Sequence, residues 1–247
     1  MFYNLIETTF VEKSIYKTII YFDLFNYPLT KEELFRYLWV HPNVSYEEFC
    51  QALQPPIANQ AIEVKYGYLF LPGREEIVEI RRRAITPTEL KLKKARAATM
   101  FISWLPFLRA NFVCNSIGAE MTKPDSDIDF FIITEKDKIW FVRFFTNAIL
   151  RLLGLRTYGE KQSNRVCLSF FVDNRHLNLA SWRVAEDDIH FAYWIHQMIP
   201  VYDPLNYYKK FLESNYWTRK YLPKLISRCL SRVGAGWFNS KIKKILE

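Results

Sequence analysis

Residues 112–134 constrain the fold of this chain more than any other stretch. The stretch opens with a short apolar run at Phe112 and Val113, crosses a small polar loop, and ends in a second apolar run that begins with Asp127 and Asp129. Residues two apart on a strand point to the same face, so the two carboxylates are predicted to project together. Neighbouring acids repel each other unless a cation lies between them. The spacing therefore predicts a divalent-metal site at the rim of a buried strand, suited to holding the metal over a phosphate.

The order strand, small residue, Ser116, loop and Asp127-Ile128-Asp129 resembles the nucleotidyltransferase fold of the DNA polymerase beta superfamily, above all its small stand-alone bacterial and archaeal members. Pro124-Asp125-Ser126 before the acids is also typical of that family. The resemblance covers residues 90–172. It implies that Asp127 and Asp129 are the catalytic carboxylates and bind Mg²⁺, and that Asn115 and Ser116 cradle the phosphates of a nucleoside triphosphate.

Two positions depart from the family pattern. The family has a glycine before the serine, where this chain has Asn115, a residue that tolerates unusual backbone angles better than most. The third family carboxylate aligns with Cys167, in a predicted strand over residues 165–172, and the nearest acid is Asp173 at the far end of that strand. Metal binding is expected to survive these changes, whereas the base for an attacking hydroxyl has no obvious candidate.

Length and composition describe a folded chain of one large or two small domains. It has 247 residues, of which 50% are hydrophobic and 17% aromatic, which excludes disorder. No apolar run is long enough to span a membrane, and the N-terminus has no signal-peptide pattern. The four cysteines are widely spaced, which predicts free thiols in a reducing compartment and not disulfides or a zinc site. We expect a cytoplasmic protein.

The net charge of +8 is concentrated at the C-terminal end. Residues 206–247 hold ten Lys and Arg against two Glu, and ten minus two equals the whole excess. A predicted helix over residues 222–233 places an apolar stripe beside a basic one. Packing onto the rest of the protein explains such a helix; anionic lipid, nucleic acid or an acidic protein partner are the alternatives.

The first 85 residues are predicted to form a winged-helix domain. Helices are expected over residues 12–24, from a capping box at Thr30 and Glu33, and from a second capping box at Ser45 and Glu48 to about residue 53. A hairpin over residues 62–71 with a Tyr-Gly turn follows. The third helix carries acids and no Lys or Arg, which argues against DNA readout and for a packing or interaction module.

Helices are also predicted over residues 74–85 and 88–104, separated by Thr86-Pro87, with a basic run from residue 81 to 96 that is either a phosphate platform or a solvated face. An apolar helix over residues 136–153 is expected to cover the sheet; a membrane-surface helix is the alternative. Further helices are predicted over residues 188–198 and 207–216.

We therefore predict an α/β (α+β) protein, with a winged-helix domain (1–85), a nucleotidyltransferase-like domain with a mixed sheet and flanking helices (86–205), and a basic helical extension (206–247). The first functional hypothesis is a magnesium-dependent nucleotidyltransferase that acts on a nucleoside triphosphate and an unidentified acceptor. The second is a catalytically degenerate nucleotide-binding or protein-interaction module on the same fold. The third and weakest is a winged-helix transcription regulator.

Overall fold

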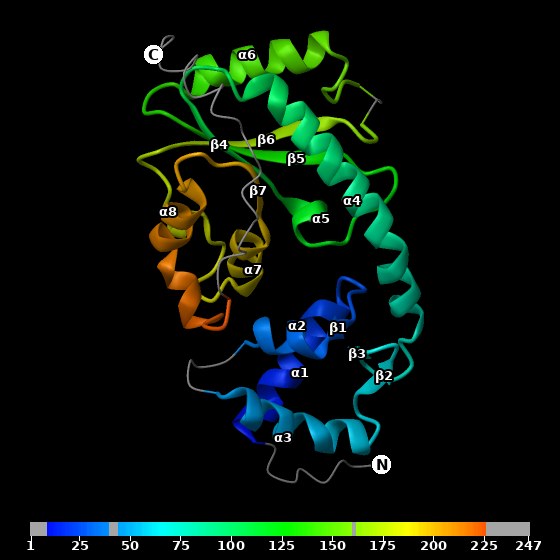
Figure 1. The fold of residues 1–247 in the computed structure, drawn as a ribbon. Coiled ribbons are helices and arrows are strands. Elements are labelled where there is room, and N and C mark those ends of the chain that lie inside the picture. Colours follow the sequence, from blue (N-terminus) through cyan, green and yellow to red (C-terminus); the bar gives the residue numbers. More distant parts are fainter. Residues whose placement is uncertain (1–8, 40–43, 160–161, 226–247) are drawn as a thin grey trace. The chain divides into compact units, whose positions relative to one another are not determined.

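The computed structural model describes residues 9–39, 44–159 and 162–225 and is of mixed α and β structure, with two sheets (Figure 1). It divides into two compact units between Arg83 and Ala84. The N-terminal unit comprises the described residues up to 83 together with 217–225, and the sheet unit comprises residues 84–216. None of the helices in this described part of the chain is long and apolar enough to cross a membrane.

The N-terminal unit contains helices α1 (Phe10–Asp23), α2 (Lys31–Arg36) and α3 (Tyr46–Ala58) and a small antiparallel sheet. The sheet has strand order β1-β3-β2, from β1 (Leu29–Thr30), β2 (Glu63–Lys65) and β3 (Tyr68–Phe70). Both predicted capping boxes are present, and a third one, Thr9 with Glu12, begins α1. The predicted hairpin turn is confirmed. Both of its central residues have positive φ, 51° at Tyr66 and 81° at Gly67, and glycine adopts such a value at little cost.

A buried ion pair joins the elements of the N-terminal unit. The Arg81 guanidinium donates to both carboxylate oxygens of Glu33 and to the carbonyl of Pro28, and it lies 4.0 Å from the centre of the Tyr27 ring. The same Glu33 carboxylate accepts from the backbone N–H of Thr30 at 2.9 Å, as the second half of the capping box. One carboxylate thus holds the start of α2, strand β1 and the chain near residue 81 together.

Proline does not end helices where the sequence analysis expected. Residues 76–102 form one helix, α4 (Glu76–Ile102), and not two, with Pro87 inside it. The Thr88 hydroxyl donates to the carbonyl of Ala84 at 2.7 Å, and buried Ala95 and Ala98 pack into the sheet core. Similarly, α3 continues five residues beyond the predicted end at 53, through Pro55 and Pro56 to Ala58. Tertiary packing here outweighs the loss of about 3 kcal/mol that proline causes in a helix interior.

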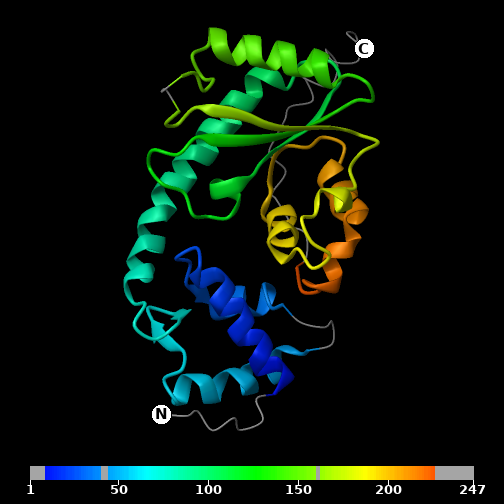
Figure 2. The same cartoon turned by 180° about the vertical axis from the view of Figure 1, so that it is seen from behind.

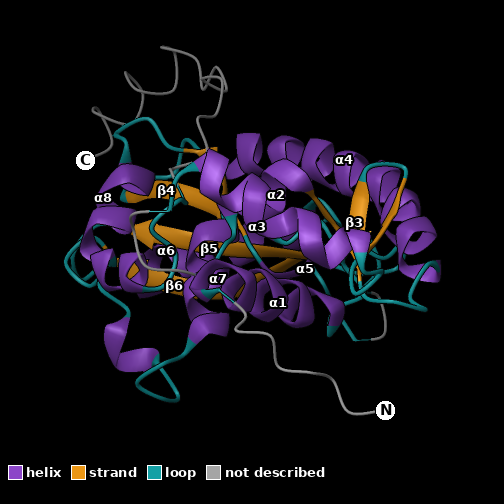
Figure 3. Cartoon of the chain, turned by 90° about the horizontal axis from the view of Figure 1, so that it is seen from below, coloured by secondary structure: helices purple, strands orange, loops and turns teal. Residues whose placement is uncertain are grey.

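The sheet unit is built on a mixed four-stranded sheet of order β6-β5-β4-β7 (labelled in Figure 1; strands are orange in Figure 3). Strand β5 (Ile128–Thr134) pairs in parallel with β6 (Val166–Asp173) and antiparallel with β4 (Leu108–Val113), which pairs antiparallel with β7 (Ile199–Tyr202). Besides α4 from residue 84 on, this unit contains α5 (Asn115–Gly118), α6 (Ile139–Leu152), α7 (Ile189–Gln197) and α8 (Tyr207–Ser214). A short 3-10 turn lies at Ala180–Trp182, and a second one, Tyr216–Lys220, begins at residue 216 and continues into the N-terminal unit.

Helices cover both faces of this sheet: α4 and α6 lie on one face, and α7 and α8 on the other (Figures 1 and 2). The side chains of β5 alternate between the two faces of the sheet. Phe130 and Ile132 belong to the core beneath α4 and α6. Phe131 points the other way, with its ring centre 6.0 Å from that of Trp194 on α7 and 5.4 Å from that of Phe211 on α8. The carboxylates that precede Phe131 at two-residue spacing therefore belong to the α7 side.

Helix α6 covers the sheet, as predicted, but only with one of its faces. Val142, Thr146 and Leu150 are fully buried. On the opposite face, Trp140 is 80% exposed and Phe144 is 67% exposed. The alternative of a membrane-surface helix is not tested by these positions.

Two further expectations differ from the structure. Residues 199–202, which follow the helix predicted over 188–198 and were not predicted as a strand, form edge strand β7, because the chain leaves α7 directly alongside β4. The helix predicted from Leu222 does not start there, since residues 222–225 are not helical and form a turn at 223 and 224; residues 226–233 of that prediction lie outside the described chain. Helix α8 agrees with the prediction for residues 207–216, to within two residues.

Candidate metal centre

The structure brings Asp127, Asp129 and Cys167 together. One ligand atom from each of the three lies within 4.8 Å of the ligand atoms of the other two, and all three residues are half-buried. Asp127 immediately precedes β5 and Asp129 is its second residue, so their spacing alone accounts for the shared face. Cys167 comes from the neighbouring strand, where it pairs directly with Asp129. The alignment of Cys167 with the two acids therefore agrees with the geometry.

A β-bulge next to this cluster adds a polar side chain to it. Between the pairs Asp129–Cys167 and Phe131–Phe170, strand β6 has one residue more than β5. Bulges redirect side chains next to functional sites. Here the Ser169 hydroxyl donates to Oδ1 of Asp129 at 2.6 Å. The sequence analysis did not single out Ser169, because its partner is 40 residues away and the bulge leaves no local signal.

Asn115 has a left-handed backbone conformation, with φ of 54°. Its Oδ1 accepts from Nε1 of Trp194 on α7 at 2.8 Å, and its side chain acts to lower the pKa of Asp129. Asn115 therefore lies beside one of the two acids and is tied to α7. Asparagine adopts positive φ more readily than other non-glycine residues, which explains how the turn into α5 is kept.

Burial raises the pKa of Asp129 above its ordinary range, and the nearby charge of Asp127 raises it further, while the hydrogen bonds from Ser169 and Asn115 act in the opposite direction. Cys114, which follows β4, is fully buried and donates its thiol to the carbonyl of Asp129 at 3.7 Å. Burial raises the pKa of Cys114 well above that of a free thiol. The site thus concentrates negative charge that a bound cation would offset.

Lys91 holds the loop that leads into Asp127. The Lys91 side chain is buried, and its Nζ donates to the carbonyl of Lys123 at 2.8 Å, to the hydroxyl of Ser126 at 2.8 Å and also to the carbonyl of Ser126. The side-chain amide of Asn164 adds a hydrogen bond to the carbonyl of Pro124 at 3.2 Å. The predicted basic run at 81–96 is therefore not a solvated face throughout, because Arg81 and Lys91 are both buried.

Ser116 is the second residue of α5 and is half-buried. Helix α5 approaches the end of α7 so closely that a Cβ added at Gly118 would lie 2.7 Å from the carbonyl oxygen of Gln197. A side chain at position 118 would therefore push α5, and Ser116 with it, away from α7. The sequence analysis did not identify this glycine, because the close approach involves a residue 79 positions further along the chain (197 minus 118).

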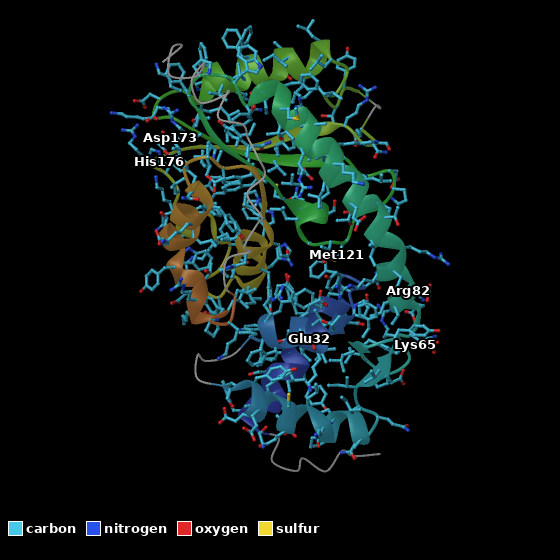
Figure 4. The ribbon with its side chains drawn as sticks, in the orientation of Figure 1. Glu32, Lys65, Arg82, Met121, Asp173 and His176 are labelled. Atoms are coloured by element: carbon cyan, nitrogen blue, oxygen red, sulfur yellow. The ribbon has the colours of Figure 1, made fainter. Side chains whose placement is uncertain are left out.

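Asp173 does not belong to the cluster. It pairs with Thr134 at the other end of β6, six residues from Cys167, which corresponds to about 20 Å along a strand. Its carboxylate accepts from the backbone N–H of Arg175 at 2.9 Å and lies 2.7 Å from Nδ1 of His176 (Figure 4). Met121, in the loop after α5, lies at the end of the sheet opposite to Asp173 (Figure 4). Asp173 is therefore too far from Asp127 and Asp129 to take part in the same site.

Comparison of the chain with protein-family models, with curated proteins and with solved structures gives no match. The chemical reading of the site consequently rests on its own residues. Two carboxylates and a thiol on adjacent strands form a set of ligands suited to a divalent cation, and half-buried Ser116 lies in the short helix α5 that follows β4.

Proposed function

We propose that the chain is a divalent-metal-dependent nucleotidyltransferase, which transfers a nucleotidyl group from a nucleoside triphosphate to an acceptor. The observation that carries the proposal is the shared face of Asp127 and Asp129, with Cys167 completing a cluster whose ligand atoms lie within 4.8 Å of one another. The mixed sheet and the order strand, short helix, loop, strand in residues 108–134 support the resemblance to the nucleotidyltransferase fold. The helices and small sheet of the N-terminal unit support the winged-helix assignment in the same way.

Asp127 and Asp129 would hold Mg²⁺, which supplies neutralisation of phosphate charge when it is bound. Asn115 would help to orient Asp129, and Ser116 would donate to the β- and γ-phosphates of the nucleotide. The acceptor hydroxyl would attack the α-phosphate in line, with pyrophosphate as the leaving group. Lys91 keeps the loop before Asp127 in position through its bonds to Lys123 and Ser126.

The alternative is a nucleotide-binding or protein-interaction module without catalysis. It is favoured by a specific observation, since Cys167 stands where a third carboxylate would serve as base and metal ligand. The third hypothesis, a transcription regulator, has less support, because α3 contains no Lys or Arg and its Glu48 carboxylate accepts from the N–H of Ser45 at 2.7 Å. Nucleic acid or an acidic protein as the partner of the basic extension (206–247) stays a prediction.

Binding of nucleoside triphosphates with Mg²⁺, followed by an assay for pyrophosphate release, tests the proposal. We expect Asp127→Asn to abolish metal-dependent nucleotide binding while the fold is retained, as judged by circular dichroism and thermal unfolding. Asp125→Asn is the matched control, because this exposed carboxylate lies in the same loop outside the metal cluster. Binding without pyrophosphate release would favour the non-catalytic module, and equal binding by wild type and Asp127→Asn would contradict both readings.

A further inference from the structure

The third member of the cluster is a sulfur ligand, and its identity bears on which ion the site selects. We infer that Asp127, Asp129 and Cys167 bind a thiophilic divalent ion of the Zn²⁺ type, through the Cys167 thiolate, in preference to Mg²⁺. The inference rests on the carboxylate pair of the proposed function and narrows the identity of its metal. It requires no nucleotide and no catalytic turnover.

The positions of the three side chains suit such an ion. Zn–S bonds are about 2.3 Å and Zn–O bonds about 2.0–2.2 Å, so ligand atoms around a tetrahedral ion lie roughly 3.5 Å apart. The separations of up to 4.8 Å in the cluster therefore close by about 1 Å when an ion binds, a change within the reach of side-chain rotation. The backbone is already arranged for it, because Asp129 and Cys167 are paired residues on adjacent strands.

Ligand chemistry separates the candidate ions. Mg²⁺ requires oxygen ligands in a near-octahedral arrangement and keeps several of its waters, whereas thiolate selects softer ions such as Zn²⁺ and Cd²⁺. On binding, the Cys167 S–H bond breaks, the sulfur–metal bond forms and the proton passes to solvent, with no change of oxidation state. Three protein ligands leave a further position open, as in catalytic zinc sites, where a water or a phosphate oxygen fits.

The cluster differs from an ordinary buried thiol and acid, because two of its ligand groups are not engaged in hydrogen bonds within the described part of the chain. Within the described part of the chain, neither the Asp127 carboxylate nor the Cys167 thiol has a hydrogen-bond partner, although both are half-buried. Cys114 provides the contrast, since its thiol already donates to the Asp129 carbonyl. Lys91, whose charge acts on Asp127, is engaged with the loop at Lys123 and Ser126. Cys167 is thus the thiol that is available to a metal here.

The test is a titration of the full chain with Cd²⁺, followed by the ultraviolet charge-transfer absorption that a thiolate–cadmium bond produces. We expect the band to form in the wild type, to resist a large excess of Mg²⁺ and to disappear when Zn²⁺ competes. Cys167→Ser should lose the band, and its Zn²⁺ affinity should fall by at least the roughly 10–100-fold that loss of an outer-shell partner causes. A triple variant with Cys50→Ser, Cys114→Ser and Cys229→Ser, which keeps Cys167, should retain the band.

A second variant keeps the test decisive if Cys167→Ser fails to fold. Cys167→Asp should also lose the band but should bind Mg²⁺ more tightly than the wild type, because its ligands are then all oxygen. The inference is overturned if the wild type shows no band, if the band survives in Cys167→Ser, or if Mg²⁺ displaces Cd²⁺ at comparable concentration. If the band forms but no nucleotide binds, the proposed transferase is rejected and the thiolate metal site is supported. If nucleotide binds with Mg²⁺ but no band forms, the thiolate metal site is rejected and the proposed transferase is supported.

Discussion

Lys91 is a buried lysine whose three hydrogen bonds all go to the loop before the metal cluster. We expect Lys91→Met to lower the free energy of unfolding by about 1–3 kcal/mol, because it leaves acceptors of Lys123 and Ser126 without their donor. It should also weaken metal binding, since the loop that places Asp127 loses its anchor. Urea unfolding and metal titration measure the two effects.

Lys93→Met is the matched control for Lys91→Met, because Lys93 lies on the same helix and is exposed. It should change the free energy of unfolding by no more than about 0.5 kcal/mol. Equal effects of the two variants would mean that Lys91 does not anchor the loop in solution.

Glu33 is the residue whose titration bears most directly on the N-terminal unit. Burial would raise its pKa, but the hydrogen bonds and charge of Arg81, with those from Thr30, outweigh burial and lower the pKa. A carboxylate with a lowered pKa stabilises the fold fully above its unfolded value, about 4.3, and loses this effect as pH falls through the folded pKa. Acid should therefore weaken this unit by protonating Glu33.

We expect Glu33→Gln to destabilise the N-terminal unit by about 3–5 kcal/mol at neutral pH, because it leaves the buried Arg81 charge without its partner. The difference from wild type should shrink as pH falls from the unfolded value of about 4.3 through the lower folded pKa of Glu33. Denaturant unfolding at a series of pH values measures it. Glu32→Gln, at the exposed neighbouring position, should show no such pH-dependent difference.

At the scale of elements, α6 has one face that is buried against the sheet and one that is exposed, and both faces carry large apolar side chains. Val142→Lys should destabilise the sheet unit by more than about 4 kcal/mol, because it places an unpaired charge in the core. Phe144→Lys should change stability by about 0.5 kcal/mol or less, because Phe144 is 67% exposed. Urea unfolding compares the two variants. A large loss of stability in Phe144→Lys would show that the outer face is covered in solution.

At the scale of the whole molecule, the chain returns to its N-terminal unit after residue 216. Residues 217–225 belong to the N-terminal unit, where Leu222 is fully buried and Nζ of Lys224 lies 5.5 Å from the centre of the Phe35 ring. A fragment that ends near residue 85 therefore lacks part of this unit. The N-terminal unit is discontinuous in sequence, which the sequence analysis did not foresee.

Leu222→Ala should reduce the stability of the N-terminal unit by about 2–5 kcal/mol, as is usual for a fully buried leucine. Hydrogen–deuterium exchange should then increase in α1 to α3 and remain unchanged in β5. Arg219→Ala, at an exposed position nearby, is the control and should leave the exchange of both units as it is. An increase in β5 instead would place residues 217–225 with the sheet unit.

The sequence alone determined those features that depend on near neighbours. Two-residue spacing placed Asp127 and Asp129 on one face, the two capping boxes marked where α2 and α3 begin, and Tyr-Gly marked the hairpin turn. In each case the interacting residues lie within about one turn or one strand of each other, so the pattern is visible in the chain. The strand that contains Cys167 was recognisable for the same reason.

Only the tertiary structure decided what joins these parts. Ser169 reaches Asp129 through a bulge, Lys91 reaches the loop at 123–126 from another helix, and the Arg81–Glu33 pair spans 48 positions. Likewise, α4 continues through Pro87, and β7 forms because β4 offers an edge to pair with. Such contacts depend on packing between residues distant in sequence, and their energies outweigh the local preferences from which helix ends and loops are predicted.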